Sequence, residues 1–201
     1  MLDRYAAALI KPAVSAIGRQ LSRAGITANQ LTLTGFLVGT IAAFLIASGA
    51  YIAGAIGIFF SRLCDALDGA VARQHTPTDR GGFLDIALDF IFYASIPLAF
   101  AVADPARNAL AAATLLAAFV GTASSFLAFA VIAAKRGMHS IDYPDKSFYF
   151  LGGLTEATET LLMFVAMCVW PQHFATLAYV FSAACAITIA TRLWYGWKAL
   201  A

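Results

Sequence analysis

Residues 62–73 read RLCDALDGAVAR and residues 81–89 read GGFLDIALD, so four aspartates stand inside stretches that are otherwise apolar enough to span a membrane. An ionised carboxylate at the centre of a bilayer costs at least ~2.5 kcal/mol on insertion scales. Four carboxylates close together would also repel one another. They become tolerable if they face the protein interior and share bound cations. The two segments therefore predict a metal site between two membrane helices.

The composition is that of an integral membrane protein. Of the 201 residues, 61% are hydrophobic and 12% are charged, with a mean hydropathy of +0.79, whereas soluble domains carry about 25% charged residues. We predict an all-α protein with one membrane domain over residues 1–201. Apolar stretches of span length, roughly 20 residues each, predict six transmembrane helices at 31–50, 52–74, 81–103, 108–135, 147–170 and 173–197.

The first 25 residues predict a helix of a different kind. At 100° per residue its apolar and basic side chains fall on opposite faces. One face carries Leu2, Leu9, Ala13, Ile17 and Leu21, and the other carries Arg4, Lys11, Arg19 and Arg23. Such a helix lies along a membrane surface with its cations toward lipid phosphates. We expect Gly25 to end it and Thr27-Ala28-Asn29 to cap the first span.

Basic residues predict the orientation of the chain. Six spans put both termini on one side, and all the Lys and Arg residues except Arg107 fall on that side or within about a turn of it. This asymmetry predicts cytoplasmic termini and places the aspartates near the cytoplasmic surface of a bacterial or archaeal-type inner or plasma membrane. The net charge of +2 gives no sign of a nucleic-acid partner.

Helical spacing gathers the groups of the first segment on one stripe. Asp65, Asp68, Gly69 and Ala72 fall at i, i+3, i+4 and i+7, within about 100° of the helix circumference. The flanking arginines stand at the edge of this stripe. The glycine and the alanine leave room for a bulky group against the helix, and Arg73 offers a fork of donors to a phosphate.

The second segment carries a matching pair of aspartates. Asp85 and Asp89 are one helical turn apart, and the connection over residues 74–80 is short enough to make the two helices antiparallel neighbours. Their carboxylates then meet at a similar depth. Oxygen donors without histidine or thiolate favour a hard cation, Mg²⁺ or Mn²⁺. Four carboxylates can hold two such ions, and paired metals suit the clamping of a diphosphate.

The complete pattern resembles the signature of the CDP-alcohol phosphotransferase (CDP-alcohol phosphatidyltransferase) family. The matching residues are Asp65-x2-Asp68-Gly69-x2-Ala72-Arg73 and Gly81-x3-Asp85-x3-Asp89. Six spans behind an amphipathic helix also fit this family. Asn29-Gln30-Leu31-Thr32 is similar to the family's Pro-Asn-x-Leu-Thr stretch, with Ala28 in place of proline. Seven residues separate Arg73 from Gly81, where the family usually has eight.

The resemblance implies a reaction and a role for each matching residue. A CDP-linked donor, commonly CDP-diacylglycerol, would pass its lipid-bearing phosphoryl group to an alcohol and release CMP. Asp65, Asp68 and Asp85 would bind metal, while Asp89 would be the general base and also touch the second of two Mg²⁺ or Mn²⁺ ions. The nucleotide contacts would be Asn29, Thr32, Gly69, Ala72, Arg73 and Thr78. The resemblance also implies a homodimer.

The acceptor alcohol is open from the sequence. A phosphorylated acceptor, such as inositol phosphate or glycerol phosphate, needs cations in its pocket. The candidates are Lys135, Arg136, Lys146 and Arg192, which could equally be membrane anchors.

Two glutamates of the fifth predicted span favour the opposite class of acceptor. Glu156 and Glu159 would share a helical face with Gly152 and would repel a phosphomonoester. They suit a neutral polyol or an amino alcohol, unless they only pair with Arg192 or Arg136. We lean toward a non-phosphorylated acceptor.

Two other functions compete with this reading. Intramembrane polyprenyl transferases also bind metal diphosphates through aspartate-rich helices, but with different aspartate spacing and without the Asp-Gly-x2-Ala-Arg string. A divalent-cation carrier would also place carboxylates in membrane helices. It would need charged groups on both sides, whereas here they cluster in one half of the membrane.

Overall fold

The computed structural model describes residues 3–75, 78–138 and 153–201, and this part of the chain is built of helices without a strand. The helices in chain order are α1 (Asp3–Arg23), α2 (Ala28–Ala47), α3 (Tyr51–Ala72), α4 (Asp79–Ala103), α5 (Pro105–Lys135), α6 (Ala157–Val169), the short 3₁₀ helix η1 (Pro171–His173) and α7 (Phe174–Ala199).

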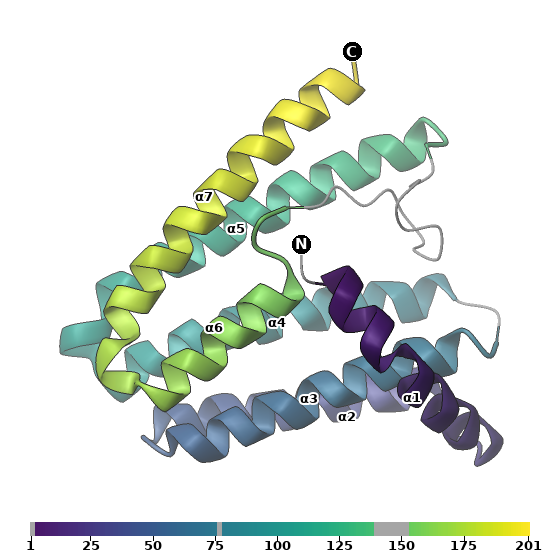
Figure 1. Cartoon of the computed structure of the whole chain (residues 1–201), viewed down its shortest axis with the longest axis horizontal. Helices are drawn as coiled ribbons and strands as arrows, with labels where there is room; N and C mark the ends of the chain where they lie inside the picture. Colours follow the sequence, from purple (N-terminus) through teal and green to yellow (C-terminus); the bar gives the residue numbers. More distant parts are fainter. Residues whose placement is uncertain (1–2, 76–77, 139–152) are drawn as a thin grey trace.

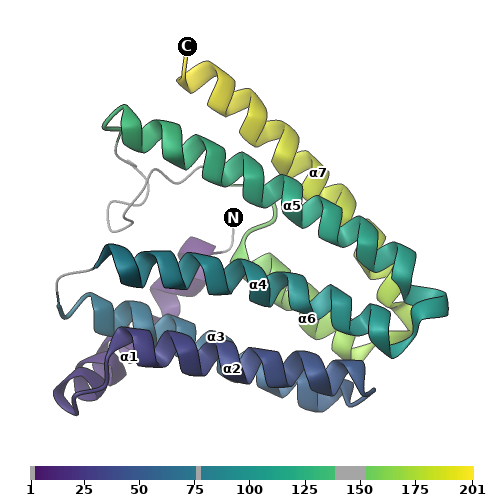
Figure 2. The ribbon, with the colours of Figure 1, turned by 180° about the vertical axis from the view of Figure 1, so that it is seen from behind.

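Figure 1 shows how the long helices run back and forth between two ends of the molecule. The turns from α2 to α3, from α4 to α5 and from α6 to α7 lie at one end, on the left of the picture. Helix α1, the end of α3 and the C-terminus of α7 lie toward the other end. Helices α5 and α7 slant away from the layer formed by α2, α3 and α4, as the view from behind also shows (Figure 2).

The helices coincide with the predicted spans except at the fifth. Four of them are long and apolar enough to cross a membrane: α2, α4, α5 and the unit of η1 with α7. Helix α3 has the length but carries three charged side chains in its second half. Helix α6 has 13 residues and begins at Ala157, so the prediction of a helix through residues 153–156 was wrong. The part of that span before residue 153 lies outside the described residues.

A capping box fixes the start of α2, as the sequence predicted for this segment. The backbone of Gly25 has a positive φ of 81°, which ends the turn after α1. The Gln30 amide nitrogen donates to Thr27 Oγ1 at 3.3 Å, and the Thr27 amide nitrogen donates to Gln30 Oε1 at 2.9 Å. This cap sets the rotation of the first turn of α2, from which Asn29 and Thr32 project.

Glycines let α2 lie directly on α3. A Cβ added at Gly35 would stand 2.9 Å from the Cβ of Cys64, and one added at Gly57 would stand 2.7 Å from the Cβ of Ala42. The close approach also allows Ser61 Oγ to donate to the Gly35 carbonyl at 2.8 Å. The backbones of α2 and α3 are thereby locked together one turn before Asp65.

The described part of α1 has three distinct sides. Val14 is buried against Leu67 and Ala70 of α3, while Gly18 lies so close that an added Cβ would meet that of Ala70 at 2.7 Å. Leu9 and Ile17 are exposed apolar side chains on a second side of the helix, and Leu9 is exposed at 83%. The basic residues of α1 from residue 9 onward, Lys11, Arg19 and Arg23, are exposed on the remaining side.

Candidate active site

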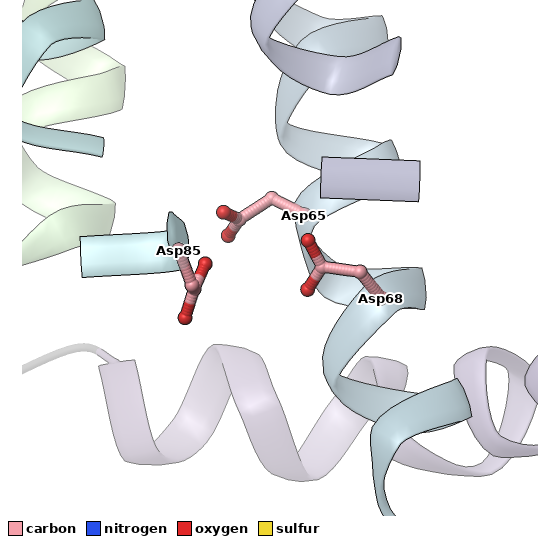
Figure 3. Close-up of side chains that lie close together, drawn as sticks. All are labelled: Asp65, Asp68 and Asp85. Carbon is pink, nitrogen blue, oxygen red and sulfur yellow. The ribbon is translucent and has the colours of Figure 1, made fainter. Parts of the chain in front are cut away.

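Three of the four aspartates converge between α3 and α4. Carboxylate oxygens of Asp65, Asp68 and Asp85 all lie within 4.8 Å of one another. Figure 3 shows the side chains from the two helices pointing into one shared space. Asp68 is the most enclosed, with 6% of its surface exposed. Oxygen ligands at this spacing match what Mg²⁺ or Mn²⁺ requires, so the donor set fits a divalent cation.

Thr32 fixes the orientation of the Asp68 carboxylate. Thr32 Oγ1 lies 2.6 Å from Asp68 Oδ2, to which it donates, and 3.0 Å from the Ala28 carbonyl. A hydroxyl has one hydrogen, so the Asp68 carboxylate and the Ala28 carbonyl share the single Thr32 hydroxyl proton. Thr32 thus connects the beginning of α2 to the acidic cluster.

Replacing Thr32 with valine should weaken manganese binding. Valine has nearly the same shape but donates nothing to Asp68, and a hydrogen bond to a charged group contributes ~1.5–3 kcal/mol, so the Kd should rise roughly tenfold or more. Isothermal titration of the purified protein with Mn²⁺ measures this change. Thr40→Val is the matched control, because the Thr40 hydroxyl donates only to the Phe36 carbonyl of its own helix. An unchanged Kd in Thr32→Val would contradict this role of Thr32.

The fourth aspartate is held by an arginine. Arg62 Nη1 lies 2.6 Å from Asp89 Oδ1 and 3.5 Å from Asp65 Oδ1. The guanidinium carbon lies 4.0 Å from the centre of the Phe92 ring, in cation–π distance. Arg62 had been placed at the edge of the acidic stripe by helical spacing. In the structure the Arg62 side chain lies between α3 and α4, in contact with Asp65 of α3 and Asp89 of α4.

All six residues predicted to bind the nucleotide line one cavity of about 540 Å³, which we call the α1–α4 cavity. They are Asn29, Thr32, Gly69, Ala72, Arg73 and Thr78. Asp68 and Asp85 form its inner wall. A Cβ added at Gly69 would stand 3.2 Å from Arg73 Nη1, so the bare glycine leaves the space in which the guanidinium lies.

A second hollow of about 360 Å³, the α4–α7 chamber, is lined by α4, α5, the start of α6 and α7. Asp89 forms part of its wall, together with aromatic side chains such as Tyr93, Phe119 and Phe126. Its other charged lining residues are Glu156 and Arg192, each 8% exposed. The hollow is therefore mainly apolar, with a few buried polar groups, which is typical of a small-molecule site.

The four aspartates connect these two spaces. Asp65, Asp68, Asp85 and Asp89 line a small pocket that also includes Arg62 and Thr32. Asp68 and Asp85 belong to this pocket and to the α1–α4 cavity, while Asp89 belongs to this pocket and to the α4–α7 chamber. Two ligands in separate cavities could thus reach one metal centre.

The remaining predicted residues do not gather in one place. Lys135 and Arg136 are exposed at the end of α5 and do not line the α4–α7 chamber. Lys146 and Gly152 lie outside the described residues. Glu156 and Glu159 do not share a helical face, because Glu156 precedes the first turn of α6. The backbone amide of Glu156 donates to Glu159 Oε2 at 3.2 Å, so the Glu159 side chain caps the N-terminus of α6.

Several lining residues carry no local signal in the sequence. His75 and Ser22 belong to the α1–α4 cavity, and Ser22 Oγ lies 2.8 Å from His75 Nε2, which ties α1 to the end of α3. Thr122 accepts from Arg192 Nη1 through its carbonyl at 3.1 Å. These pairs are 53 and 70 residues apart in the chain.

Comparison of the whole chain with known proteins gives one consistent result. The model of the family described as CDP-alcohol phosphatidyltransferase matches residues 25–194. The inner membrane protein YnjF of Escherichia coli K12 is 51% identical over 200 residues, covering 100% of this chain and 97% of that protein. The archaetidylinositol phosphate synthase of Pyrococcus horikoshii is 30% identical over 169 residues, covering 80% of this chain and 87% of the synthase.

Solved structures show the same fold. The crystal structure of Mycobacterium tuberculosis phosphatidylinositol phosphate synthase with CDP-DAG bound superposes with a TM-score of 0.72 at 24% identity, covering 92% of this chain and 93% of that one. The same synthase in complex with manganese and citrate gives a TM-score of 0.71, covering 92% and 88%. At this identity the likeness concerns the fold.

Proposed function

The chain belongs to the CDP-alcohol phosphatidyltransferase family, and from this premise we propose that its four aspartates form the metal centre at which a CDP-linked lipid exchanges CMP for an alcohol. The membership makes the chain a transferase of phospholipid synthesis and decides against a polyprenyl transferase or a cation carrier. The observation that carries the proposal is the position of the aspartates: all four line one small pocket, Asp68 and Asp85 also line the α1–α4 cavity, and Asp89 also lines the α4–α7 chamber.

Asp65, Asp68 and Asp85 would hold the first of two divalent cations, and Asp89 would take part in holding the second. Their oxygens are close enough to share an ion, and Thr32 already orients the most buried of them. The manganese complex of the tuberculosis synthase supports this assignment. The bound metal would neutralise charge that develops on the diphosphate as the bond to CMP breaks.

The α1–α4 cavity is proposed to take the CDP part of the donor. Its inner wall carries Asp68 and Asp85, so a diphosphate on the metals would leave the cytidine among the six predicted contact residues. Arg73 can donate to a phosphate oxygen through two nitrogens. CDP-diacylglycerol is the proposed donor, in line with the ligand of the tuberculosis synthase.

The α4–α7 chamber is proposed to take the acceptor alcohol. Asp89 lies on its wall, where its carboxylate could receive the proton of an acceptor hydroxyl as that oxygen bonds to the lipid-bearing phosphorus. Arg62 Nη1 lies 2.6 Å from one Asp89 oxygen, so the position of this arginine bears directly on the carboxylate.

Charge in the chamber favours a non-phosphorylated acceptor, a polyol or an amino alcohol. Among the described residues its charged lining is Asp89, Glu156 and Arg192, two anions against one cation. The Arg192 charge is already shared with the Thr122 carbonyl and lies near the glutamate. A phosphomonoester dianion would meet no surplus of positive charge there.

A phosphorylated acceptor is the second candidate. The Pyrococcus horikoshii relative is named an archaetidylinositol phosphate synthase, and Arg192 is a buried guanidinium facing the same chamber. A panel assay separates the two: purified protein with CDP-diacylglycerol and Mn²⁺ is given inositol, glycerol, serine, inositol phosphate or glycerol phosphate, and CMP and the lipid product are identified. We expect CMP with the non-phosphorylated alcohols. CMP only with the phosphorylated ones would reverse the assignment.

Glu156→Gln should raise the KM for the acceptor about tenfold, because a hydrogen bond between the acceptor and a charged group is lost. The KM for the CDP donor should stay within about twofold of the wild-type value. Glu156 lines the α4–α7 chamber but not the α1–α4 cavity. Steady-state kinetics with each substrate varied in turn measures the difference. Glu159→Gln is the control, because Glu159 lies outside the chamber lining. Equal changes in both KM values, or none, would count against the acceptor role.

The same proposal includes a membrane setting. We propose six spans, formed by α2 to α7, with both termini and the aspartates on the cytoplasmic side, as the Lys and Arg asymmetry predicts. Helix α1 would lie in the interface, because its exposed apolar side, its packed side and its basic side point in three directions. The whole chain would form one membrane domain, and a homodimer is proposed from the family resemblance.

A further inference from the structure

Arg62 stands where a cation would be expected. It comes from α3, one turn before Asp65, and its Nη1 contacts carboxylates of both helices, at 2.6 Å from Asp89 and 3.5 Å from Asp65. With 12% of its side chain exposed, it has little water to compensate its charge. One guanidinium thus neutralises part of the repulsion between these two aspartates.

The guanidinium is held firmly but is not fully satisfied. Phe92 stacks on it at 4.0 Å and Ser61 Oγ accepts from Nη2 at 3.3 Å. Its Nε is buried and has no hydrogen-bond partner in the described part of the chain. A buried charged donor without a partner is costly, so this arrangement leaves Arg62 able to gain by moving to a new acceptor.

The two halves of the cluster therefore differ. Asp65, Asp68 and Asp85 approach one another within 4.8 Å, but one oxygen of Asp89 is engaged by Arg62. A cation that uses Asp89 must compete with a guanidinium at 2.6 Å, whereas among the other three carboxylates the guanidinium reaches only Asp65, at the longer distance of 3.5 Å.

We propose that Arg62 makes the two cation positions unequal: the first ion binds to the open triad, and Arg62 guards Asp89 so that the second ion binds much more weakly until the guanidinium is displaced. This inference rests on the proposed metal centre. The diphosphate of the donor would give the released guanidinium a new acceptor. Arg62 is then a positioning residue, which acts on the reaction through Asp89.

Manganese titration of the metal-stripped protein in nanodiscs tests this without any turnover. Isothermal titration gives the two affinities, and electron paramagnetic resonance of unbound Mn²⁺ counts the bound ions. In the wild type we expect one tight ion and a second that is weaker by at least roughly tenfold, the coupling measured for close charge pairs. Arg62→Met keeps the stem on Phe92 and removes the charge, so it should bind the second ion at least roughly tenfold more tightly than the wild type does.

Three further variants keep the outcome interpretable. Arg62→Lys retains a charge and should stay unequal, and Arg62→Gln replaces the methionine variant if that one does not fold by circular dichroism. Arg107→Met is the matched control, because Arg107 forms an exposed pair with Asp104, also three residues away, at the start of α5. It should titrate like the wild type.

The outcomes separate this inference from the proposed function. Equal affinities in the wild type, or the same isotherm in the wild type and in Arg62→Met, would overturn the guarding role alone. A wild type that binds only one ion, with two in Arg62→Met, would support it. If the wild type binds no manganese, the metal centre itself fails and this inference falls with it.

Discussion

Asp68→Asn should abolish CMP release, with kcat/KM down by roughly a thousandfold or more, because a metal centre supplies several kcal/mol of charge stabilisation. Asparagine has the shape of aspartate and can still accept the Thr32 hydroxyl, so the packing is preserved. What is lost is one of the three negative charges that converge on the proposed metal. Asp68 is 6% exposed, so water has little room to replace the missing ligand.

A matched variant separates this effect from a general loss of charge. Asp79→Asn makes the same chemical change in the first turn of α4, at an exposed position outside the lining of the three cavities. It should retain activity within about twofold, as surface substitutions usually do. Manganese titration should show weak or no binding in Asp68→Asn. Normal turnover in Asp68→Asn would contradict the proposed site.

Asp89→Asn should act mainly on kcat. Removing a general base costs about 10²- to 10⁴-fold, and the carboxylates of the first metal position are left in place. The KM for the CDP donor should change much less than kcat, because Asp89 lines the α4–α7 chamber and not the α1–α4 cavity and shares in holding only the second proposed ion. Asparagine can still accept from Arg62, which limits any disturbance of that side chain.

Metal binding distinguishes the two variants. Asp89→Asn should still bind the first manganese ion with an affinity close to that of the wild type, whereas Asp68→Asn should not. If Asp89→Asn loses the first ion as well, Asp89 is a ligand of that ion and the division between the triad and the base is wrong. An unchanged kcat would remove Asp89 from catalysis.

Much of the site follows from the sequence because it is encoded by local periodicity. Asp65 and Asp68 share one helical face, and the short connection after α3 turns the chain back, so the approach of Asp85 could be expected. The prediction that α3 and α4 pack as direct neighbours was wrong, because both helices pack on α2 and their carboxylates meet across the space between them. Periodicity also placed Gly69, Ala72 and Arg73 beside the aspartates, whereas the other residues predicted for the α1–α4 cavity, Asn29, Thr32 and Thr78, came from the family resemblance.

The rest depends on contacts that periodicity does not encode. Helical spacing put Arg62 at the edge of a stripe, but its long side chain reaches across to α4, and the choice of Asp89 depends on the Phe92 ring above it. The α4–α7 chamber is assembled from four separate segments, and no single one of them shows a motif. The fifth predicted span failed at residues 153–156, where Gly153 and Glu156 form a hydrogen-bonded turn that ends before the helix begins.

Crystals grown with Mn²⁺ and measured at the manganese absorption edge would test the central claim most directly. The account predicts an anomalous peak between α3 and α4, bounded by the carboxylates of Asp65, Asp68 and Asp85. Well-ordered carboxylates with no peak between them, or manganese bound only elsewhere on the chain, would contradict it.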